Sequence, residues 1–368
     1  MAAGLVPFPG VPAAPRPGAV QAEWARLRSD VRAGGFHRRT AARVLLELAF
    51  ALSVAVAGLV AYLASHHPAV RVLALLAGAW GAVAIGTNTH TSSHYATSDR
   101  RWLNELLTYF GFPFCLQYSA TFWWRKHVAL HHPAPNVVGR DEDADLQPWL
   151  AFTRPEVERA SGLRRLYYRC QWPFALLLLA GIHFNMMVTG WRFLCGRLRE
   201  PRERRRAHLY DLSALLLFWA VWVGVPMAFF PAADVLSFYA WRTALVGYGL
   251  FAVLAPGHFP AEAAVLAPEA ADEDFLRLQT ASTVDFRTGP LGRLLCAGLE
   301  YQIEHHLFPG LSHVHYPKVS GLVGEFCRRN GLPYRSLGWG EAVWKSFLVF
   351  VRPKPVELRA PVTGRGGV

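Results

Sequence analysis

Four long apolar stretches interrupt the polar pattern of the chain. They cover residues 42–64, 69–88, 209–230 and 234–256. The hydrocarbon core of a bilayer, about 30 Å thick, needs roughly 20 apolar residues in a helix, and each stretch reaches that length. The pattern therefore predicts an all-α integral membrane protein with four transmembrane helices.

A fifth apolar stretch, residues 172–195, is more mixed. His183 and Asn185 interrupt it, and aromatic residues and Arg flank it. This mixture favours a helix that lies in the membrane interface or is half buried there. A fifth crossing is the alternative, and the positions of the arginines argue against it, because an odd number of spans would separate basic segments that belong on one side.

Positively charged residues lie on one side of the predicted membrane. The links SHHPA and PAA, which join the first helix to the second and the third to the fourth, contain no Lys or Arg. Residues 1–41, 97–208 and 257–368 are rich in Arg. Because basic segments stay in the cytoplasm, both termini and the segment between the second and third helices are expected there. The basic run at 197–208 is expected to contact anionic lipid headgroups rather than nucleic acid.

Composition agrees with this division. Apolar residues make up 52% of the 368 residues and charged residues 17%, which is too apolar for an ordinary soluble protein. The net charge of +12 comes almost entirely from Arg, a bias that favours a bacterial inner membrane as the location. The five scattered cysteines form no CxxC pair, so no disulfide frame or thiolate metal site is expected. We expect a flexible cytoplasmic segment at 1–41, a main domain at 42–325 and a cytoplasmic C-terminal segment at 326–368.

Eight of the 15 histidines fall into four groups on the predicted cytoplasmic side. The groups are HTSSH at the end of the second helix, HVALHH in the segment after it, one histidine beyond the fourth helix, and QIEHH near the C-terminus. The orientation rests on Arg alone, so the agreement of the histidines supports it independently. The eight candidate metal ligands are His90, His94, His127, His131, His132, His258, His305 and His306.

The spacing within these groups predicts shared helix faces. Positions i and i+4 of an α-helix share a face, which pairs His90 with His94, His127 with His131, and Gln302 with the second histidine of QIEHH. Imidazole is a ligand for Zn, Cu, Fe and Ni. A catalytic zinc ion takes about three protein ligands, so eight histidines suggest two metal ions. A solvated or capping histidine is the alternative for a single pair, but adjacent buried imidazoles are costly unless bound or hydrated.

The remaining seven histidines are expected to serve elsewhere. His66 and His67 lie in an outer link and are expected to contact headgroups or solvent. The histidines expected at the surface or interface are His37, His183 and His208. His313 and His315 stay unassigned.

The ordered set HTSSH, HVALHH and QIEHH resembles the three histidine boxes of the membrane fatty acid desaturases. QIEHHLFP is similar to the third box of the front-end and bacterial acyl-lipid members in particular. The resemblance covers about residues 42–325 and implies four membrane helices with a cytoplasmic helical cap. It implies two iron ions bound by the eight histidines, among which His258 matches by location a ligand that follows the last helix.

The same resemblance implies an oxygen-dependent enzyme that introduces a double bond into a fatty acyl chain carried by lipid, CoA or carrier protein. A hydroxylase of the same di-iron class is the alternative. A zinc hydrolase would need fewer histidines, and a transporter would distribute them across the membrane. Two departures concern the front-end members. Thr91 stands where many of them have Asp, and no His-Pro-Gly-Gly haem motif occurs.

Further residues near the boxes are candidates for the site. Asn often follows the second box in this family, and the run DEDAD resembles the family's Asp-x-Asp stretch, although a solvated loop explains it equally well. Such residues could ligate a metal weakly or orient the imidazoles. These candidates are Gln302, Asn136, Glu304, Asp143 and Asp145.

Substrate and electrons are expected to reach the site from different directions. Phe122, Trp123 and Trp124 stand beside the second box and could line an apolar channel for the acyl chain, or form an interfacial belt. Electrons are expected from a separate protein, a ferredoxin or a b-type cytochrome with its reductase, which the basic cytoplasmic face would attract.

Overall fold

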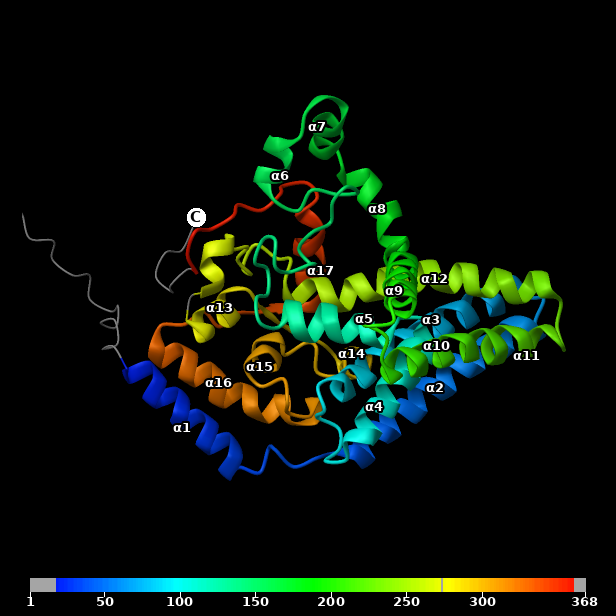
Figure 1. Ribbon diagram of the computed structural model, residues 1–368, viewed down its shortest axis with the longest axis horizontal. Coiled ribbons are helices and arrows are strands. Elements are labelled where there is room, and N and C mark those ends of the chain that lie inside the picture. The colour runs from blue at the N-terminus through cyan, green and yellow to red at the C-terminus, as the bar shows by residue number, and fades with distance from the viewer. Residues whose placement is uncertain (1–17, 273, 361–368) are drawn as a thin grey trace, which may run out of the picture.

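The computed structural model describes residues 18–272 and 274–360. Nearly all regular structure in this part of the chain is helical. Long helices are gathered at one end of the molecule and shorter ones surround the other end (Figure 1). The α-helices are α1 (Ala19–Ala33), α2 (Ala41–Ala64), α3 (Pro68–Ser93), α4 (Arg101–Tyr109), α5 (Ala120–Trp123), α6 (Arg154–Arg159), α7 (Gly162–Arg169), α8 (Trp172–Ala180), α9 (Ile182–Arg199), α10 (Arg206–Phe218), α11 (Val225–Met227), α12 (Ala232–Leu254), α13 (Phe275–Ala281), α14 (Pro290–Cys296), α15 (Gln302–Leu307), α16 (Tyr316–Asn330) and α17 (Trp339–Leu348).

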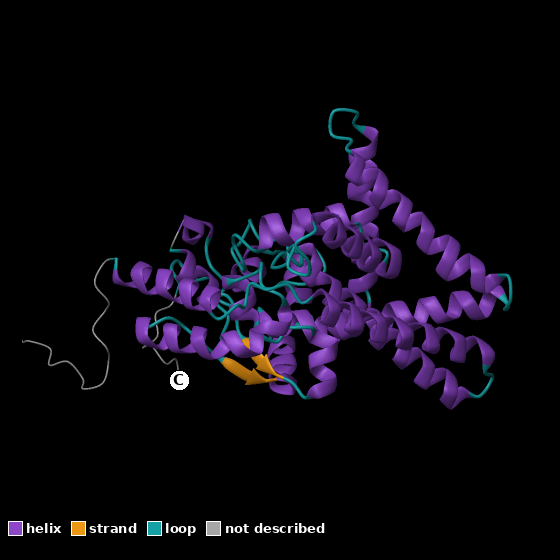
Figure 2. Cartoon of the chain, turned by 90° about the horizontal axis from the view of Figure 1, so that it is seen from below, coloured by secondary structure: helices purple, strands orange, loops and turns teal. Residues whose placement is uncertain are grey.

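Shorter elements complete the described chain. The π-helical segments are η1 (Phe110–Cys115), η2 (Trp124–His131) and η3 (Trp219–Gly224), and the 3₁₀ turns are η4 (Ala255–Gly257), η5 (Pro268–Asp272) and η6 (His313–His315). Strands β1 (Asp285–Arg287) and β2 (Ser336–Gly338) pair in parallel at one edge of the body (Figure 2). This small sheet is the only departure from the predicted all-α class within the described residues.

Four helical stretches are long and apolar enough to cross a membrane, as predicted. They are Ala41–Ala64, Pro68–Ser93, Arg206–Met227 and Ala232–Gly257. The second ends at Ser93 rather than at residue 88, so one continuous helix carries most of the HTSSH motif. The mixed stretch at 172–195 forms α8 and α9, which meet at a bend of 60° and would make a fifth span only if the bent pair counts as one.

Small residues let the first two spans approach closely. A Cβ atom added to Gly58 of α2 would lie 2.5 Å from the backbone nitrogen of Gly78 on α3, and one added to Gly81 would lie 2.6 Å from that of Ala55. Close backbone approach through small residues is a common way for membrane helices to pack without a hydrophobic driving force. The α2–α3 pair thereby becomes a firm support for the end of α3.

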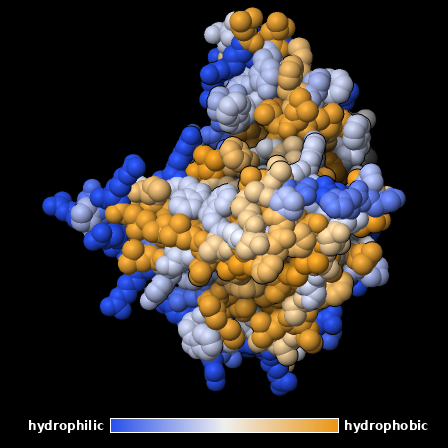
Figure 3. All heavy atoms as spheres, turned by 90° about the vertical axis from the view of Figure 1, so that its right-hand side faces the viewer, coloured by the Kyte–Doolittle hydropathy of each residue, from blue (hydrophilic) through white to orange (hydrophobic). Residues whose placement is uncertain are grey.

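Apolar side chains cover the face at the end of the long helices (Figure 3). Large apolar side chains are exposed along these helices, including Leu46 and Phe50 on α2 and Leu216 on α10. Exposed apolar patches of this extent need a covering, and the helices that carry them have the length of a bilayer core. The hydrophilic side chains lie mainly at the rim of this face.

The two segments predicted to flank the main domain are ordered where the structure describes them. Residues 1–17 lie outside the described part, but α1 follows and packs Leu27 and Val31 into a core shared with α16 and α15. At the other end, Ala342 of α17 is buried in the same apolar cluster as Val83 of α3. Terminal segments and spans therefore form one packed body around the histidine motifs.

Candidate metal centre

The polar end of α3 is buried inside the protein. Here Thr87 donates to the carbonyl oxygen of Leu295 at 2.6 Å, and Asn88 donates to that of Val44 at 3.1 Å. Because these two buried donors have acceptors, the helix can continue beyond its apolar part into the protein body. It thereby delivers His90 on its last turn and His94 at its C-terminal end.

The second histidine motif lies on a π-helical segment. Asp211 of α10 secures the start of α5, which this segment continues, because its carboxylate accepts hydrogen bonds from the hydroxyl groups of Ser119 and Thr121 at 2.6 and 2.5 Å and from two backbone N–H groups. The wider turn bonds residue i+5 to i, as His132 N–H does to the carbonyl of His127 at 3.1 Å. His127 and His132 consequently converge, with their Nε2 atoms 3.2 Å apart.

This turn adds to the predicted pairing of His127 with His131. The two rings do lie side by side, with centroids 5.3 Å apart, and they form a possible ligand group with Asp143. The π-helical turn also brings His132 to His127 and directs His131 to His258 and His306, which i, i+4 spacing on an α-helix did not predict. The motif therefore serves two centres.

The third motif forms the short helix α15, and His258 follows the end of α12. Strand β1 fixes the start of α15, since Asp285 accepts the backbone N–H of Ile303 at 2.9 Å. On α15, neighbouring His305 and His306 diverge to different groups. All eight predicted ligands are thereby brought together from four distant segments.

The imidazoles form two adjoining groups. Each group offers one nitrogen per ring, and these atoms lie within 4.8 Å of one another. The groups touch through His132 and His306, whose ring centroids are 4.4 Å apart. We call them the five-histidine group (His90, His94, His127, His132 and His305) and the three-histidine group (His131, His258 and His306).

Unsatisfied nitrogen atoms mark the centre of both groups. The buried Nε2 atoms of His94, His305 and His306 have no hydrogen-bond partner. Burial lowers the pKa of His94 and of His258 to about 3, so these imidazoles are neutral and keep a free lone pair. Buried polar atoms without partners are rare in folded proteins, and neutral imidazole is the form that binds metal ions. The donor set therefore fits two metal ions.

Hydrogen bonds from the outer nitrogens direct the rings of the three-histidine group. His131 Nδ1–H donates to Asp141 at 2.9 Å, and His306 Nδ1–H donates to the amide oxygen of Gln279 at 2.8 Å. His258 Nδ1–H donates to the carbonyl oxygen of Ser282 at 3.2 Å. Each bond leaves Nε2 as the lone-pair atom, which is the usual role of such partners in metal sites.

Charge distinguishes His131 from the other two. Burial lowers its pKa, but the carboxylate of Asp141 outweighs burial and the net direction is upward. The opposite effect is seen on Asp141, whose pKa lies well below its usual range because His131 and two backbone N–H groups stabilise the carboxylate against its burial. An ionised Asp141 behind His131 makes that imidazole the most basic of its group.

The acidic side chains predicted to lie near the metal site make different contacts. Asp141, the first residue of DEDAD, makes the short contact to His131, whereas Asp143 lies 3.7 Å from His131 and pairs with Lys126. Asp143 nevertheless forms a possible ligand group with His127 and His131. Asp145 is exposed and accepts the backbone N–H of Gln147. Glu304 is buried but turns to the hydroxyl of Tyr334, which donates to it at 2.8 Å. Among the described residues, neither Asp145 nor Glu304 is in a group with the histidines.

Two amide side chains lie beside the three-histidine group. Asn136 donates to the carbonyl oxygens of His258 at 2.8 Å and Ala264 at 3.1 Å, so it holds the loop and its oxygen is not committed to a histidine. Gln302 is buried against Gly257, where an added Cβ atom would lie 2.3 Å from its Cγ atom. The missing side chain at Gly257 is what admits Gln302 next to His258.

The three aromatic candidates separate. Trp123 stacks on the ring of His127, with centroids 4.4 Å apart, and belongs to the same apolar cluster as Phe112 and Leu250. Phe122 packs against Phe193 of α9, and Trp124 donates its indole N–H to the carbonyl of Ser93 at 3.0 Å. Only Trp123 connects the histidines to an apolar interior.

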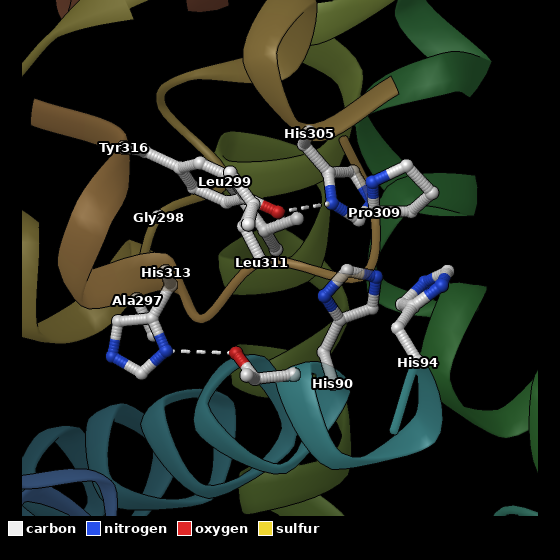
Figure 4. Close-up of a pocket in the computed structure, with 11 residues that line it drawn as sticks. His90, His94, Ala297, Gly298, Leu299, His305, Pro309, Leu311, His313 and Tyr316 are labelled. Atoms are coloured by element: carbon white, nitrogen blue, oxygen red, sulfur yellow. Dashed lines mark hydrogen bonds between the residues drawn. The ribbon is translucent and has the colours of Figure 1, made fainter. Parts of the chain in front are cut away.

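A small cavity adjoins the five-histidine group (Figure 4). Its volume is about 10 Å³, the room of roughly one water molecule. His90, His94 and His305 line one side, and His305 Nδ1–H donates to the hydroxyl of Tyr316 at 3.2 Å. On the far side of the cavity, His313 forms hydrogen bonds with Thr91 at 2.7 Å and with Glu47 at 2.8 Å. These contacts show where His313 lies, which the sequence analysis left unassigned.

Other histidine expectations are partly wrong. His183 is buried in α9 rather than at the surface, and His208 is buried where its Nδ1 accepts the backbone N–H of Arg205 at the start of α10. His66 and His67 are exposed in the link between α2 and α3. No motif pointed to Gln279 or Tyr316, which lie next to the histidines only after folding.

Comparison with known proteins gives consistent matches. The model of the fatty acid desaturase family matches residues 66–338. Over 323 residues the chain is 29% identical to the Delta(5) fatty acid desaturase fat-4 of Caenorhabditis elegans, covering 84% of this chain and 68% of that protein. It is 30% identical over 262 residues to the Delta(8)-fatty-acid desaturase of Euglena gracilis, covering 68% of this chain and 60% of that protein. It is 27% identical to the sn-1 linoleoyl-lipid 6-desaturase of Arthrospira platensis over 282 residues, 72% of each chain.

Proposed function

The chain belongs to the fatty acid desaturase family, and on that premise we propose that it introduces a double bond into a fatty acyl chain with dioxygen and two iron ions. One observation carries the proposal. Eight histidines from four distant segments converge in two adjoining groups, in which the buried Nε2 atoms of His94, His305 and His306 lack partners. A single catalytic zinc ion takes about three protein ligands and would leave most of these imidazoles unexplained.

Two iron ions held by these histidines would supply the oxidising power, with dioxygen, that removes two hydrogens from adjacent carbons, because no ordinary side chain can do so. The chain's own residues prepare the centre. Asp141 and Gln279 hold the Nδ1–H groups of His131 and His306 and thereby keep the Nε2 atoms directed inward. Gln302 beside Gly257 is a candidate for a further, weak ligand of the three-histidine group.

The apolar cluster next to Trp123 is the proposed site for the reacting part of the acyl chain. It contains Phe112 of η1, Leu116 directly after η1, and Leu250 of α12. Trp123 forms its border with the histidines, since its ring stacks on His127 and its indole N–H is bound by the hydroxyl of Ser93 at 3.1 Å. Such a border excludes water from the reacting carbons and orients the chain past the metal site.

We further propose that the protein lies in a bacterial inner membrane with both termini and the metal centre in the cytoplasm. The Arg-free links between the spans and the Arg-rich remainder support this orientation. The electron donor would be a ferredoxin or a small b-type cytochrome with its reductase, attracted by the basic face. Turnover with such a donor should then slow as salt rises, and a rate that is insensitive to salt would contradict the electrostatic part of the proposal.

Expression in a host with simple lipids, followed by fatty acid analysis, tests the reaction. A new unsaturated acyl chain that depends on the expressed protein is the expected result, and mass spectrometry of its derivatives gives the bond position. An acyl chain with an added hydroxyl and no double bond would instead identify a hydroxylase. Neither product, in membranes that contain the folded protein and a competent donor, would contradict the proposal.

Metal analysis tests the centre itself. About two iron ions per chain are expected, and one zinc ion without iron would refute the oxidative mechanism. Replacing His131 or His306 by Ala should abolish activity and lower the iron content while the protein still inserts. His66→Ala is the matched control, because His66 is exposed in the α2–α3 link and should leave both measurements unchanged.

A further inference from the structure

A buried lysine lies directly behind the three-histidine group. Lys354 is only 5% exposed, and its Nζ donates hydrogen bonds to the carbonyl oxygens of Pro260 at 2.8 Å, His258 at 3.4 Å and Ala263. All three acceptors belong to the loop that follows α12 and carries His258. A single ammonium group thus binds three backbone carbonyl oxygens of one loop.

Charge makes this arrangement unusual. The carboxylate of Glu262 favours a charged Lys354 from a distance but forms its salt bridge with Lys345, and the Lys354 Nζ lies 5.7 Å from the centroid of the Phe152 ring. Three carbonyl acceptors require three N–H donors, which only the ammonium form supplies. A buried charge without such partners is strongly unfavourable, so the carbonyl oxygens and the ammonium depend on each other.

The segment that carries Lys354 is tied to residues 152–154 and, farther along, to the loop that follows α12. Its backbone N–H donates to the carbonyl of Phe152 at 3.0 Å, and its carbonyl accepts the N–H of Arg154 at 2.8 Å. Three residues later, Glu357 exchanges backbone hydrogen bonds of 2.8 Å with Val265 and Ala267. We call residues 352–360 the C-terminal strap. It lies beyond residues 66–338, over which the family model matches.

His258 depends on this scaffold more than the other ligands of its group. His131 and His306 are on helical segments, whereas His258 lies at the end of a 3₁₀ turn, with φ −132° and ψ −26°. Its carbonyl oxygen is held by Asn136 and Lys354 together. Without an ordered loop the imidazole would lose its position relative to the other two.

We propose that the C-terminal strap is part of the metal centre, and that Lys354 is a positioning residue which sets His258, and with it the three-histidine group, through the carbonyl oxygens of its loop. The inference rests on the proposed two-metal function. It predicts that the two groups respond differently to the loss of Lys354. The five-histidine group takes its ligands from α3, the second motif and α15 and should keep its metal.

The test compares metal binding by purified full-length variants. Lys354→Met keeps the length of the side chain and removes its charge and donors. Metal-depleted protein is titrated with Co²⁺, whose visible bands report coordination, and iron content is measured after reconstitution. Wild type should bind two ions. Lys354→Met should bind one ion as wild type does and the second about 10–100-fold more weakly, the usual effect of losing an outer partner.

Double variants assign the weakened site. Adding Lys354→Met to His131→Ala should change metal binding little, because both act on the same group, whereas adding it to His94→Ala should impair both sites. Lys318→Met, at an exposed lysine of α16, should behave as wild type. Phe238→Leu, in the core between the spans, should lower thermal stability but keep both ions, which separates positioning from general destabilisation.

Wild-type affinity for both ions in folded Lys354→Met would overturn the inference. If that variant does not fold, Lys354→Gln retains two amide donors and should fold with the same selective loss, and two tightly bound ions in it would equally overturn the inference. Failure of the proposed function looks different. Wild type would then bind no pair of metal ions, or would bind them and make no desaturated product.

Discussion

Replacing Asp141 by Asn tests the metal centre with a change of minimal size. The buried carboxylate accepts three hydrogen bonds, from His131 Nδ1–H at 2.9 Å, Asn136 N–H at 2.8 Å and Asp143 N–H at 2.9 Å. The amide has the same shape but only one acceptor oxygen and no charge. One of the three donors would therefore face an NH₂ group instead of an oxygen.

The magnitude follows from these three bonds. Two retained bonds each weaken by about 1 kcal/mol when the acceptor loses its charge, and a buried donor without an acceptor costs about 1–3 kcal/mol. Asp141→Asn should thus lower the free energy of unfolding by about 3–5 kcal/mol. The loss of a carboxylate behind a metal-binding imidazole should also weaken the metal ion of the three-histidine group about 10–100-fold.

Iron content and thermal unfolding of the purified protein measure both effects. Asp145→Asn is the matched control, because Asp145 is exposed in the same acidic run and contacts only its own turn, so it should bind two iron ions with unchanged stability. If Asp141→Asn also held two iron ions as tightly as wild type and unfolded within about 0.5 kcal/mol of it, the carboxylate would have no part in the centre.

Three further predictions concern single residues. Burial raises the pKa of Glu300 from 4.5 to about 7. The free-energy cost of keeping an ionised Glu300 in the folded state therefore grows between pH 4.5 and 7 to about 3 kcal/mol. Glu300→Gln should raise the unfolding temperature at pH 8 and not at pH 4, and equal effects at both pH values would exclude this account. Gln302→Ala should lower activity while Gln302→His retains it, if the side chain is a ligand; a fully active Ala variant would mean that Gln302 only fills the space left by Gly257. Asp211→Asn should lower the iron content, although Asp211 is on a long apolar helix, because Asp211 secures the start of α5, which leads into the second motif. An unchanged iron content would show that the second motif keeps its conformation without Asp211.

The sequence predicted the spans well because hydropathy acts locally along a helix. Any run of about 20 apolar residues must satisfy its backbone groups internally if it is in lipid, and the four stretches do form helices of that length. The polar helix ends that carry the histidine motifs were harder to predict from the sequence. The end of α3 is polar, and its burial depends on acceptors such as the carbonyls of Leu295 and Val44, which are distant in the chain.

The sequence also identified all eight histidines that converge, but not how they divide. Equal i, i+4 spacing predicted that His127 and His131 act together, and their rings do stack, but the π-helical turn also brings His132 to His127 and His131 to His258 and His306. Among the acidic residues, DEDAD marked the right run, and the folded loop gives Asp141 the shorter contact to His131 and leaves Asp143 beside His127 and His131. Spacing rules assume a regular α-helix, so they could not place His132, whose position follows from the π-helical turn.

Residues that act through backbone contacts had no sequence signal. Gln279 and Lys354 belong to no motif, and each acquires its role from groups that are far away in the chain, at His306 and in the loop of His258. Amino-acid sequence by itself determined the four long apolar helices and the kind of ligand, because hydropathy and imidazole chemistry belong to single residues and short runs. Tertiary structure alone decided the five-and-three division of the histidines and the partners behind them, because those depend on distances between segments that only the folded chain brings together.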